Sequence, residues 1–227
     1  MQAYEDKRSR ERDNRSDSMC TSFSFARVQT SIPRAPVEPH VQIKLMFYEP
    51  DPLGVDNLTN IAVATITRQK TYDRAGNIQH THFAHVELAL GHDLTGNAFE
   101  TNPLGQMMAF SINQYSPLYF KFKLFRRQYR SISLGIPVSK YKHLYGLCST
   151  LSAEPIKFDA WGMYAGPVAP DVLVKNRSRK IHGTYCSRII TEVMQESGVG
   201  NDAFMRLKPW RVTPNLLSTC FTEASLG

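Results

Sequence analysis

Long apolar runs and an apolar N-terminus are both missing from this sequence of 227 residues. No stretch reaches the roughly eighteen consecutive apolar residues that a membrane-spanning helix needs. The first residues are charged where a secretory signal would carry an apolar run. We therefore expect a soluble protein that is made in the cytosol and is neither secreted nor transmembrane.

Paired cysteines are also absent. The four cysteines, Cys20, Cys148, Cys186 and Cys220, lie far apart and form no C-x-x-C motif, so neither a zinc ribbon nor a disulfide framework is indicated. Spacing also disfavours a metal site that would combine Cys148 with His143 and a distant pair of ligands. We expect reduced thiols, no metal ion and no other cofactor.

The N-terminal region has little that could form a core. Residues 1–18 contain no Leu, Ile, Val or Phe and mix charges of both signs, which predicts an arm that is disordered or becomes ordered on a partner. Prolines at positions 33, 36 and 39 predict an extended linker, because each fixes φ and removes a donor. We assign residues 1–40 to this arm and linker and residues 41–227 to one folded domain.

Apolar periodicity within the domain predicts a mixture of strands and helices. Period-two alternation predicts strands at 41–48, 120–124 and 132–136 and a hairpin over 82–101, whereas helical spacing predicts helices at 138–153 and 185–196 and a short one starting at Thr213-Pro214. Residues 58–69 fit either a strand or a helical face. Together these elements predict an α+β fold in which an antiparallel sheet packs against helices.

Positive charge exceeds negative charge by 7, and much of the excess lies in two segments, Lys121–Arg130 and Lys175–Lys180. Such segments are candidates for contact with an acidic partner, a membrane surface or nucleic acid. Neither carries a nucleic-acid-binding motif, so two solvated faces are the alternative interpretation. The N-terminal arm is a further candidate for binding another protein.

Cys186 is the first candidate catalytic residue, because it falls in the first turn of the predicted helix. Unpaired backbone N–H groups and the positive end of the helix dipole favour a thiolate there. Apolar residues follow at spacings of three, four, seven and eight, at Ile189, Ile190, Val193 and Met194. That stripe must pack inward, so Cys186 is expected at the buried edge of the helix.

His85 is the second candidate, near the start of the strand that opens the predicted hairpin. With a loop over Gly91–Gly96, Leu90 would oppose Asn97, and His85 would share a face with Glu100 on its diagonal. A glutamate there can hydrogen-bond an imidazole nitrogen and fix its tautomer. Glu87 and Asn102 are weaker candidates for the same task.

Each of these residues also has a purely structural interpretation. A single strand histidine is commonly a partly buried residue without a catalytic role, and a helix cysteine is commonly a small core group. His82 and His92 are less well placed than His85. The three other cysteines lie in the arm, in the middle of a predicted helix and in a terminal helix, where a catalytic role is not expected.

Four short segments, in this order, resemble the circularly permuted papain-like hydrolases. They are His85–Leu88 (HVEL), Phe158–Tyr164 (FDAWGMY), Thr184–Ser187 (TYCS) and Arg211–Leu217 (RVTPNLL). This group includes permuted NlpC-type amidases, YiiX-like proteins and lecithin retinol acyltransferase-like enzymes. Its members carry the histidine strand before the cysteine helix, the reverse of papain, and the resemblance covers about residues 41–222.

The resemblance implies a permuted papain-like fold with Cys186 as nucleophile, His85 as base and Glu100 as the third polar residue. Many members have a histidine at that third position, so this chain departs from the pattern there. The resemblance also favours a helix over residues 57–69. The chemistry implied is acyl transfer through a thioester on Cys186.

Three functions follow as hypotheses. The first is a cysteine hydrolase acting on a peptide, amide or isopeptide bond, and the second is a lipid-directed thioesterase or acyltransferase with Lys121–Arg130 facing a membrane. The third is a catalytically inactive binding or structural protein, for instance a virion component, that uses its basic segments and its arm. The protein is accordingly expected in the cytoplasm or in a virus particle.

Overall fold

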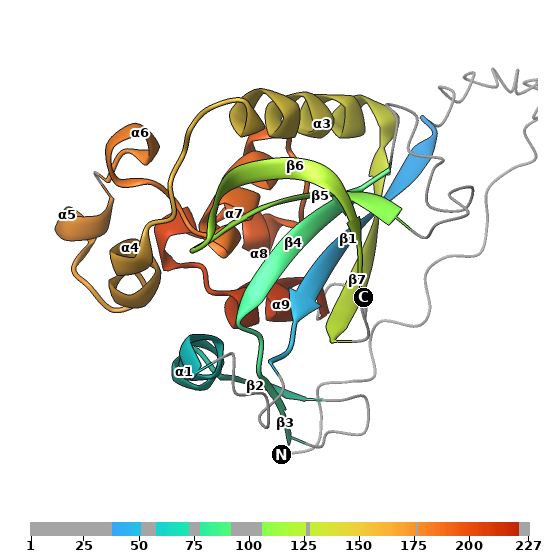
Figure 1. Cartoon of the computed structure of the whole chain (residues 1–227). Coiled ribbons are helices and arrows are strands. Elements are labelled where there is room, and N and C mark those ends of the chain that lie inside the picture. Colours follow the sequence, from blue (N-terminus) through green and yellow to red (C-terminus); the bar gives the residue numbers. More distant parts are fainter. Residues whose placement is uncertain are drawn as a thin grey trace, which may run out of the picture. The chain divides into compact units, whose positions relative to one another are not determined.

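A five-stranded antiparallel sheet with helices packed on it forms the domain, which is therefore α+β (Figure 1). The computed structural model describes residues 38–50, 58–72, 78–91, 106–125, 128–175 and 177–222, all within the unit Glu38–Gly227. Of the arm and linker predicted over residues 1–40, residues 1–37 lie outside the described residues. No helix in the described ranges has the length and apolarity to cross a bilayer.

The sheet has the strand order β6-β5-β4-β1-β7. Its strands are β1 His40–Tyr48, β4 His85–Leu90, β5 Gln106–Asn113, β6 Ser116–Leu124 and β7 Tyr129–Pro137. The strands predicted at 41–48, 120–124 and 132–136 are confirmed as β1, β6 and β7. In β1 the alternating side chains Val41, Ile43, Leu45 and Phe47 are buried, as expected for one face of a pleated strand, whereas Phe122 and Leu124 at the end of β6 are exposed.

The predicted hairpin register is wrong. The strand that pairs with β4 is β5, so Leu90 lies opposite Met108 and not opposite Asn97. The turn formers Gly91 and Gly96 suggested an early return of the chain. However, the strand that pairs with β4 must also present apolar side chains to the core. β5 does so, because its Phe110 and Ile112 are fully buried. Glu100 and Asn102 lie outside the described residues.

The sheet is strongly curled, because its two edge strands are consecutive in the chain. Only residues 125–128 separate β6 from β7, and a connection of that length spans at most about 17 Å. In a flat five-stranded sheet the edges would be about 19 Å apart. Lys123 Nζ at the end of β6 donates to Tyr129 Oη at the start of β7 at 2.9 Å, so the edges approach across the concave face of the sheet, and Figure 1 shows β6 arching over it.

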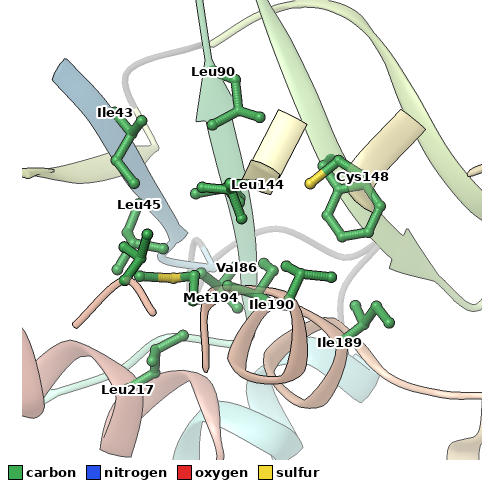
Figure 2. Packing of buried hydrophobic residues seen from close by; sticks show 14 of the residues in the cluster. Ile43, Leu45, Val86, Leu90, Leu144, Cys148, Ile189, Ile190, Met194 and Leu217 are labelled. Atoms are coloured by element: carbon green, nitrogen blue, oxygen red, sulfur yellow. The ribbon is translucent and has the colours of Figure 1, made fainter. Parts of the chain in front are cut away.

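The other face of the sheet carries the hydrophobic core. Val86, Leu88 and Leu90 of β4 are fully buried there and belong to one apolar cluster with α3 Val138–Ser152, α7 Cys186–Glu196 and α9 Pro214–Thr222. Figure 2 shows Ile190 and Met194 of α7 beside Val86. The helices predicted at 138–153, at 185–196 and after Thr213-Pro214 are confirmed.

A helix and a small second sheet stand beside the start of β4. Residues 58–69 are mainly helical, as α1 Leu58–Ile66, and the chain then enters β2 Gln69–Tyr72, which pairs with β3 Ile78–Thr81. The helix expected from the resemblance is therefore present, and Gln69 belongs to a strand. The remaining short elements are α4 Ala160–Ala165, α5 Asp171–Val174, α6 Arg179–His182, α8 Asp202–Met205 and η2 Pro209–Arg211.

Asn215 on α9 ties together the segments that lead into β4. Its Oδ1 accepts from the backbone N–H of Phe83 at 2.8 Å. Its Nδ2 donates to the Phe83 carbonyl at 3.1 Å and to Thr67 Oγ1 at 2.7 Å. Because Asn215 is fully buried, no solvent replaces these partners, and the side chain fixes the backbone two residues before His85.

We expect Asn215→Leu to lower the free energy of unfolding by about 3 kcal/mol, because it leaves a buried N–H and a buried C=O of Phe83 unpaired. Equilibrium denaturation in urea measures the loss. Gln42→Leu on β1 is the control, since it replaces an exposed amide and is expected to change stability by less than about 0.5 kcal/mol. Equal stability of the two variants would show that the Asn215 contacts contribute little.

Candidate active site

Cys186 and His85 line the same pocket, which has a volume of about 260 Å³. Cys186 is the first residue of α7 and is 2% exposed. His85 is the first residue of β4, and its side chain is 15% exposed. The structure thus brings together two residues that are about a hundred positions apart in the sequence, where helix α7 packs on the sheet.

The electrostatics of His85 depend on that neighbour. Burial by itself lowers the pKa of His85, but the charge of the Cys186 side chain and a hydrogen bond to it, together with Glu87, outweigh burial and raise the pKa to about 9. The imidazole is therefore protonated at neutral pH when it faces a Cys186 thiolate. An ion pair of this kind is the reactive form of cysteine nucleophiles.

Two segments that stood out in the sequence hold the start of α7 in place. Phe158 and Thr184 form a parallel β-bridge, in which Thr184 N donates to Lys157 O at 2.9 Å and Asp159 N donates to Thr184 O at 2.7 Å. Gly183 adopts φ of +87°, and a Cβ there would clash with the Lys157 carbonyl. The position therefore requires glycine, and the bridge sets the direction in which the chain enters the helix.

The first turn of α7 leaves backbone donors near the sulfur. Tyr185 is the N-cap residue and makes no side-chain capping hydrogen bond. The first bond of the helix runs from Ile189 N to Tyr185 O, at 3.0 Å. The N–H groups of Cys186 and the next two residues precede it, so they form the positive end of the helix dipole and are suited to stabilise an oxyanion.

Glu87 lies behind His85 on the concave face of the sheet, and its side chain is 1% exposed. His85 Nε2 is 3.3 Å from Glu87 Oε1. The same oxygen accepts from Tyr119 Oη at 3.0 Å, from Tyr129 Oη at 3.1 Å and from Lys123 Nζ. Because Nε2 faces the carboxylate, Nδ1 is left as the ring nitrogen that can exchange a proton with the thiol.

The charge on Glu87 is maintained by its partners. Burial raises the pKa of Glu87, but contact with His85 and the charge of Lys123 lower it to about 2, so the group is a carboxylate at neutral pH. Burial and the charge of Glu87 raise the pKa of both Tyr119 and Tyr129, so both phenols stay protonated and remain donors. Glu87 is therefore the carboxylate that faces the imidazole of His85 in this structure.

Sequence reasoning missed most of this cluster. Glu87 entered only as a weaker alternative to Glu100, and Lys123 was assigned to a basic segment with no link to the site. Tyr119 and Tyr129 were not singled out. The sequence signal was the position of Glu87 two residues after His85, which places both on one face of a strand. Nothing local indicated that β6 and β7 would curl over that face.

The remaining predicted residues do not join the site. Cys148 is a fully buried core residue of α3, and burial raises the pKa of its thiol. Cys220 is partly buried against the same core. Cys20 and His92 lie outside the described residues. Within the described ranges, no three His, Cys, Asp or Glu side chains are grouped in a way that could hold a metal ion.

Comparison with known proteins identified no relative of this chain. No protein-family model, curated protein or solved structure matches the chain. The geometry of the site itself therefore provides the indication of function. That geometry combines a cysteine at the N-terminus of a buried helix, a histidine on the adjoining strand and a buried carboxylate at 3.3 Å from the imidazole.

Proposed function

We propose that this protein is a cysteine-dependent acyl-transfer hydrolase with a permuted papain-like fold. One observation carries the proposal: Cys186 and His85 line one pocket, and Glu87 contacts the far nitrogen of the imidazole. A nucleophile, a base and a group that orients the base are the parts that thiol acyl transfer requires. The order of the elements, with the histidine strand before the cysteine helix, agrees with the permuted arrangement.

The reaction proceeds through a thioester. The thiol proton of Cys186 passes to His85, and the sulfur attacks the carbonyl carbon of the substrate while backbone N–H groups at the start of α7 bind the oxyanion. Collapse of the intermediate breaks the bond to the leaving group, which takes the proton from His85. Water then loses a proton to His85 and attacks the thioester, which releases the acid and restores the thiol.

The lining of the pocket favours a neutral amide substrate. Three carboxamide side chains, those of Asn60, Asn113 and Gln114, line the pocket, and such groups pair well with peptide N–H and C=O groups. The Lys123 ammonium is bound to Glu87, so it is already neutralised and is not a site for a substrate anion. A peptidase, amidase or isopeptidase fits this chemistry.

Formation of an acyl-enzyme tests the proposal without knowledge of the natural substrate. We expect p-nitrophenyl acetate at pH 7 to add one acetyl group to the protein, which peptide mapping locates on Cys186 and which hydroxylamine removes. Cys220→Ala serves as the control, because it removes a partly buried thiol outside the pocket and should leave acetylation intact, whereas Cys186→Ala should abolish it. Acetylation spread over several cysteines, or none on Cys186, would favour the inactive binding protein.

A further inference from the structure

Four aliphatic side chains stand exposed on the segment that carries α4, α5 and α6. Val168 is 81% exposed, Val172 73%, Leu173 56% and Ile181 80%. Trp161 and Tyr164 of α4 are also exposed. We call residues 161–175 and 177–182 the α4–α6 surface. Figure 1 shows its three short helices together, beyond the edge of the sheet. Scattered apolar residues are common on protein surfaces, but this many within one short segment is typical of an interaction site.

The α4–α6 surface carries an excess of positive charge. Its carboxylate, Asp171, accepts from Arg211 at 2.9 Å and from Lys208, so its negative charge is neutralised. Lys175 and Lys180 are exposed, and no carboxylate among the described residues forms an ion pair with either. The surface therefore combines exposed aliphatic groups with two uncompensated ammonium groups.

The backbone beneath these side chains is firmly held. Arg177 makes two hydrogen bonds to the buried Asp159, at 2.8 and 3.1 Å, and its guanidinium lies 4.4 Å from the centre of the Trp161 ring. Arg211 donates to the carbonyl of Pro167 at 2.8 Å. These contacts fix the backbone of the segment, so the exposure of its aliphatic side chains is a defined feature of the fold.

We propose that the α4–α6 surface docks on an anionic lipid bilayer. Charge complementarity and apolar exposure together point to this partner: the lysines face anionic headgroups, and the aliphatic side chains enter the acyl boundary beneath them. Trp161 and Tyr164 have an apolar body and a polar tip, which suits the interface. An acidic protein would match the lysines, but it would need a separate pocket for each side chain on these short helices, whereas a fluid bilayer admits them individually.

Docking would also orient the pocket. Met163 of α4 lines the pocket, while Trp161 and Tyr164 of the same helix are exposed. Helix α4 therefore contributes one side chain to the pocket and two to the surface, so docking would fix the orientation of the pocket relative to the bilayer. This binding does not depend on the thiol chemistry, so it can be tested on protein that lacks the nucleophile.

Co-sedimentation with vesicles tests the proposal, using the full chain and its Cys186→Ala variant. We expect both to bind phosphatidylserine-containing vesicles equally, to bind pure phosphatidylcholine vesicles at least about tenfold more weakly, and to be released by high salt. The double variants Val172→Ser/Ile181→Ser and Lys175→Glu/Lys180→Glu should each weaken binding at least about tenfold.

Two matched variants serve as controls away from the surface. Ile66→Ser replaces an equally exposed aliphatic residue on α1, and Lys142→Glu reverses an exposed charge on α3, so both should bind within about twofold of the wild type. The proposal is overturned if wild-type protein does not sediment with anionic vesicles, or if all four variants bind alike. Binding to polyglutamate but not to vesicles would also overturn it and would identify an acidic protein partner instead.

Discussion

Replacement of His85 by alanine is expected to slow the alkylation of Cys186 by iodoacetamide at pH 7 on the order of 100-fold. Iodoacetamide is neutral and reacts with thiolate, so its rate reports how much thiolate the site maintains. In the wild type, the charge of the Cys186 side chain helps to raise the pKa of His85 to about 9, and the imidazolium is the group that would pair with a thiolate. Without the imidazolium, the thiolate loses its counterion.

The pH dependence of alkylation separates this electrostatic role from a loss of structure. In the wild type His85 should keep its proton across neutral pH and lose it near its pKa of about 9, so alkylation should already be fast at pH 7. In the His85→Ala variant the rate should rise only at higher pH, as it does for free cysteine. His82→Ala removes a nearby histidine that does not line the pocket and should react like the wild type. Identical profiles for the wild type and His85→Ala would remove the basis for a catalytic pair.

Replacement of Glu87 by glutamine should lower the free energy of unfolding by about 3–5 kcal/mol at pH 7. The change conserves shape but removes the carboxylate that forms ion pairs with both His85 and Lys123 on the concave face. The amide nitrogen would also face donors. Glu49→Gln is the matched control, because Glu49 pairs with Arg130 at an exposed position and should cost less than about 1 kcal/mol. Urea denaturation of the two variants gives both values.

The sign of the pH effect follows from the direction of each pKa shift. The pKa of Glu87 is lowered to about 2, so its contribution to stability is present above about pH 4.5 and is lost as pH falls towards 2. The pKa of His85 is raised to about 9, so its contribution is present below about pH 6.5 and is lost as pH rises through 9. The deficit of Glu87→Gln should therefore shrink in acid, and a deficit that is constant from pH 2 to pH 7 would contradict the buried ion pair.

Loss of stability and loss of thiol reactivity need separate readouts in Glu87→Gln. We expect the variant that remains folded to show slower alkylation of Cys186 as well, because the carboxylate no longer orients the imidazole or favours its charged form. Recording near-ultraviolet circular dichroism alongside the alkylation rate identifies the folded fraction. Glu87 is a positioning residue in this scheme, since it contacts His85 rather than a reacting atom.

Elements with a long, regular apolar period could be predicted from the sequence. The strands β1, β6 and β7 and the helices α3, α7 and α9 all contribute apolar side chains to a common core, and burial of one face is what creates a period of two or of about 3.6 residues. In β6 this burial covers Leu118 and Phe120 but not Phe122 and Leu124, which are exposed. The position of Cys186 at the first turn of its helix followed from the same pattern. His85 followed from its place at the start of an apolar strand.

The partner of β4 and the residue that orients His85 could not be predicted in this way. A turn signal at Gly91–Gly96 says where a chain is able to reverse, but pairing is decided by which later strand offers the matching apolar face, and β5 does so. The erroneous register directed attention to Glu100, whereas the contact to His85 comes from Glu87. The pairing of β4 was therefore decided by a strand distant in the sequence and not by the nearest turn signal.

By itself, the sequence determined the α+β class and the approximate span of α7, and it singled out Cys186 and His85 as candidates, because these depend on periodicity within a few residues of chain. Only the tertiary structure decided which groups surround the imidazole. The curl of the sheet brings Lys123 and Tyr129 from its two edge strands onto Glu87. This arrangement depends on contacts between residues far apart in the chain, and so no local pattern encodes it.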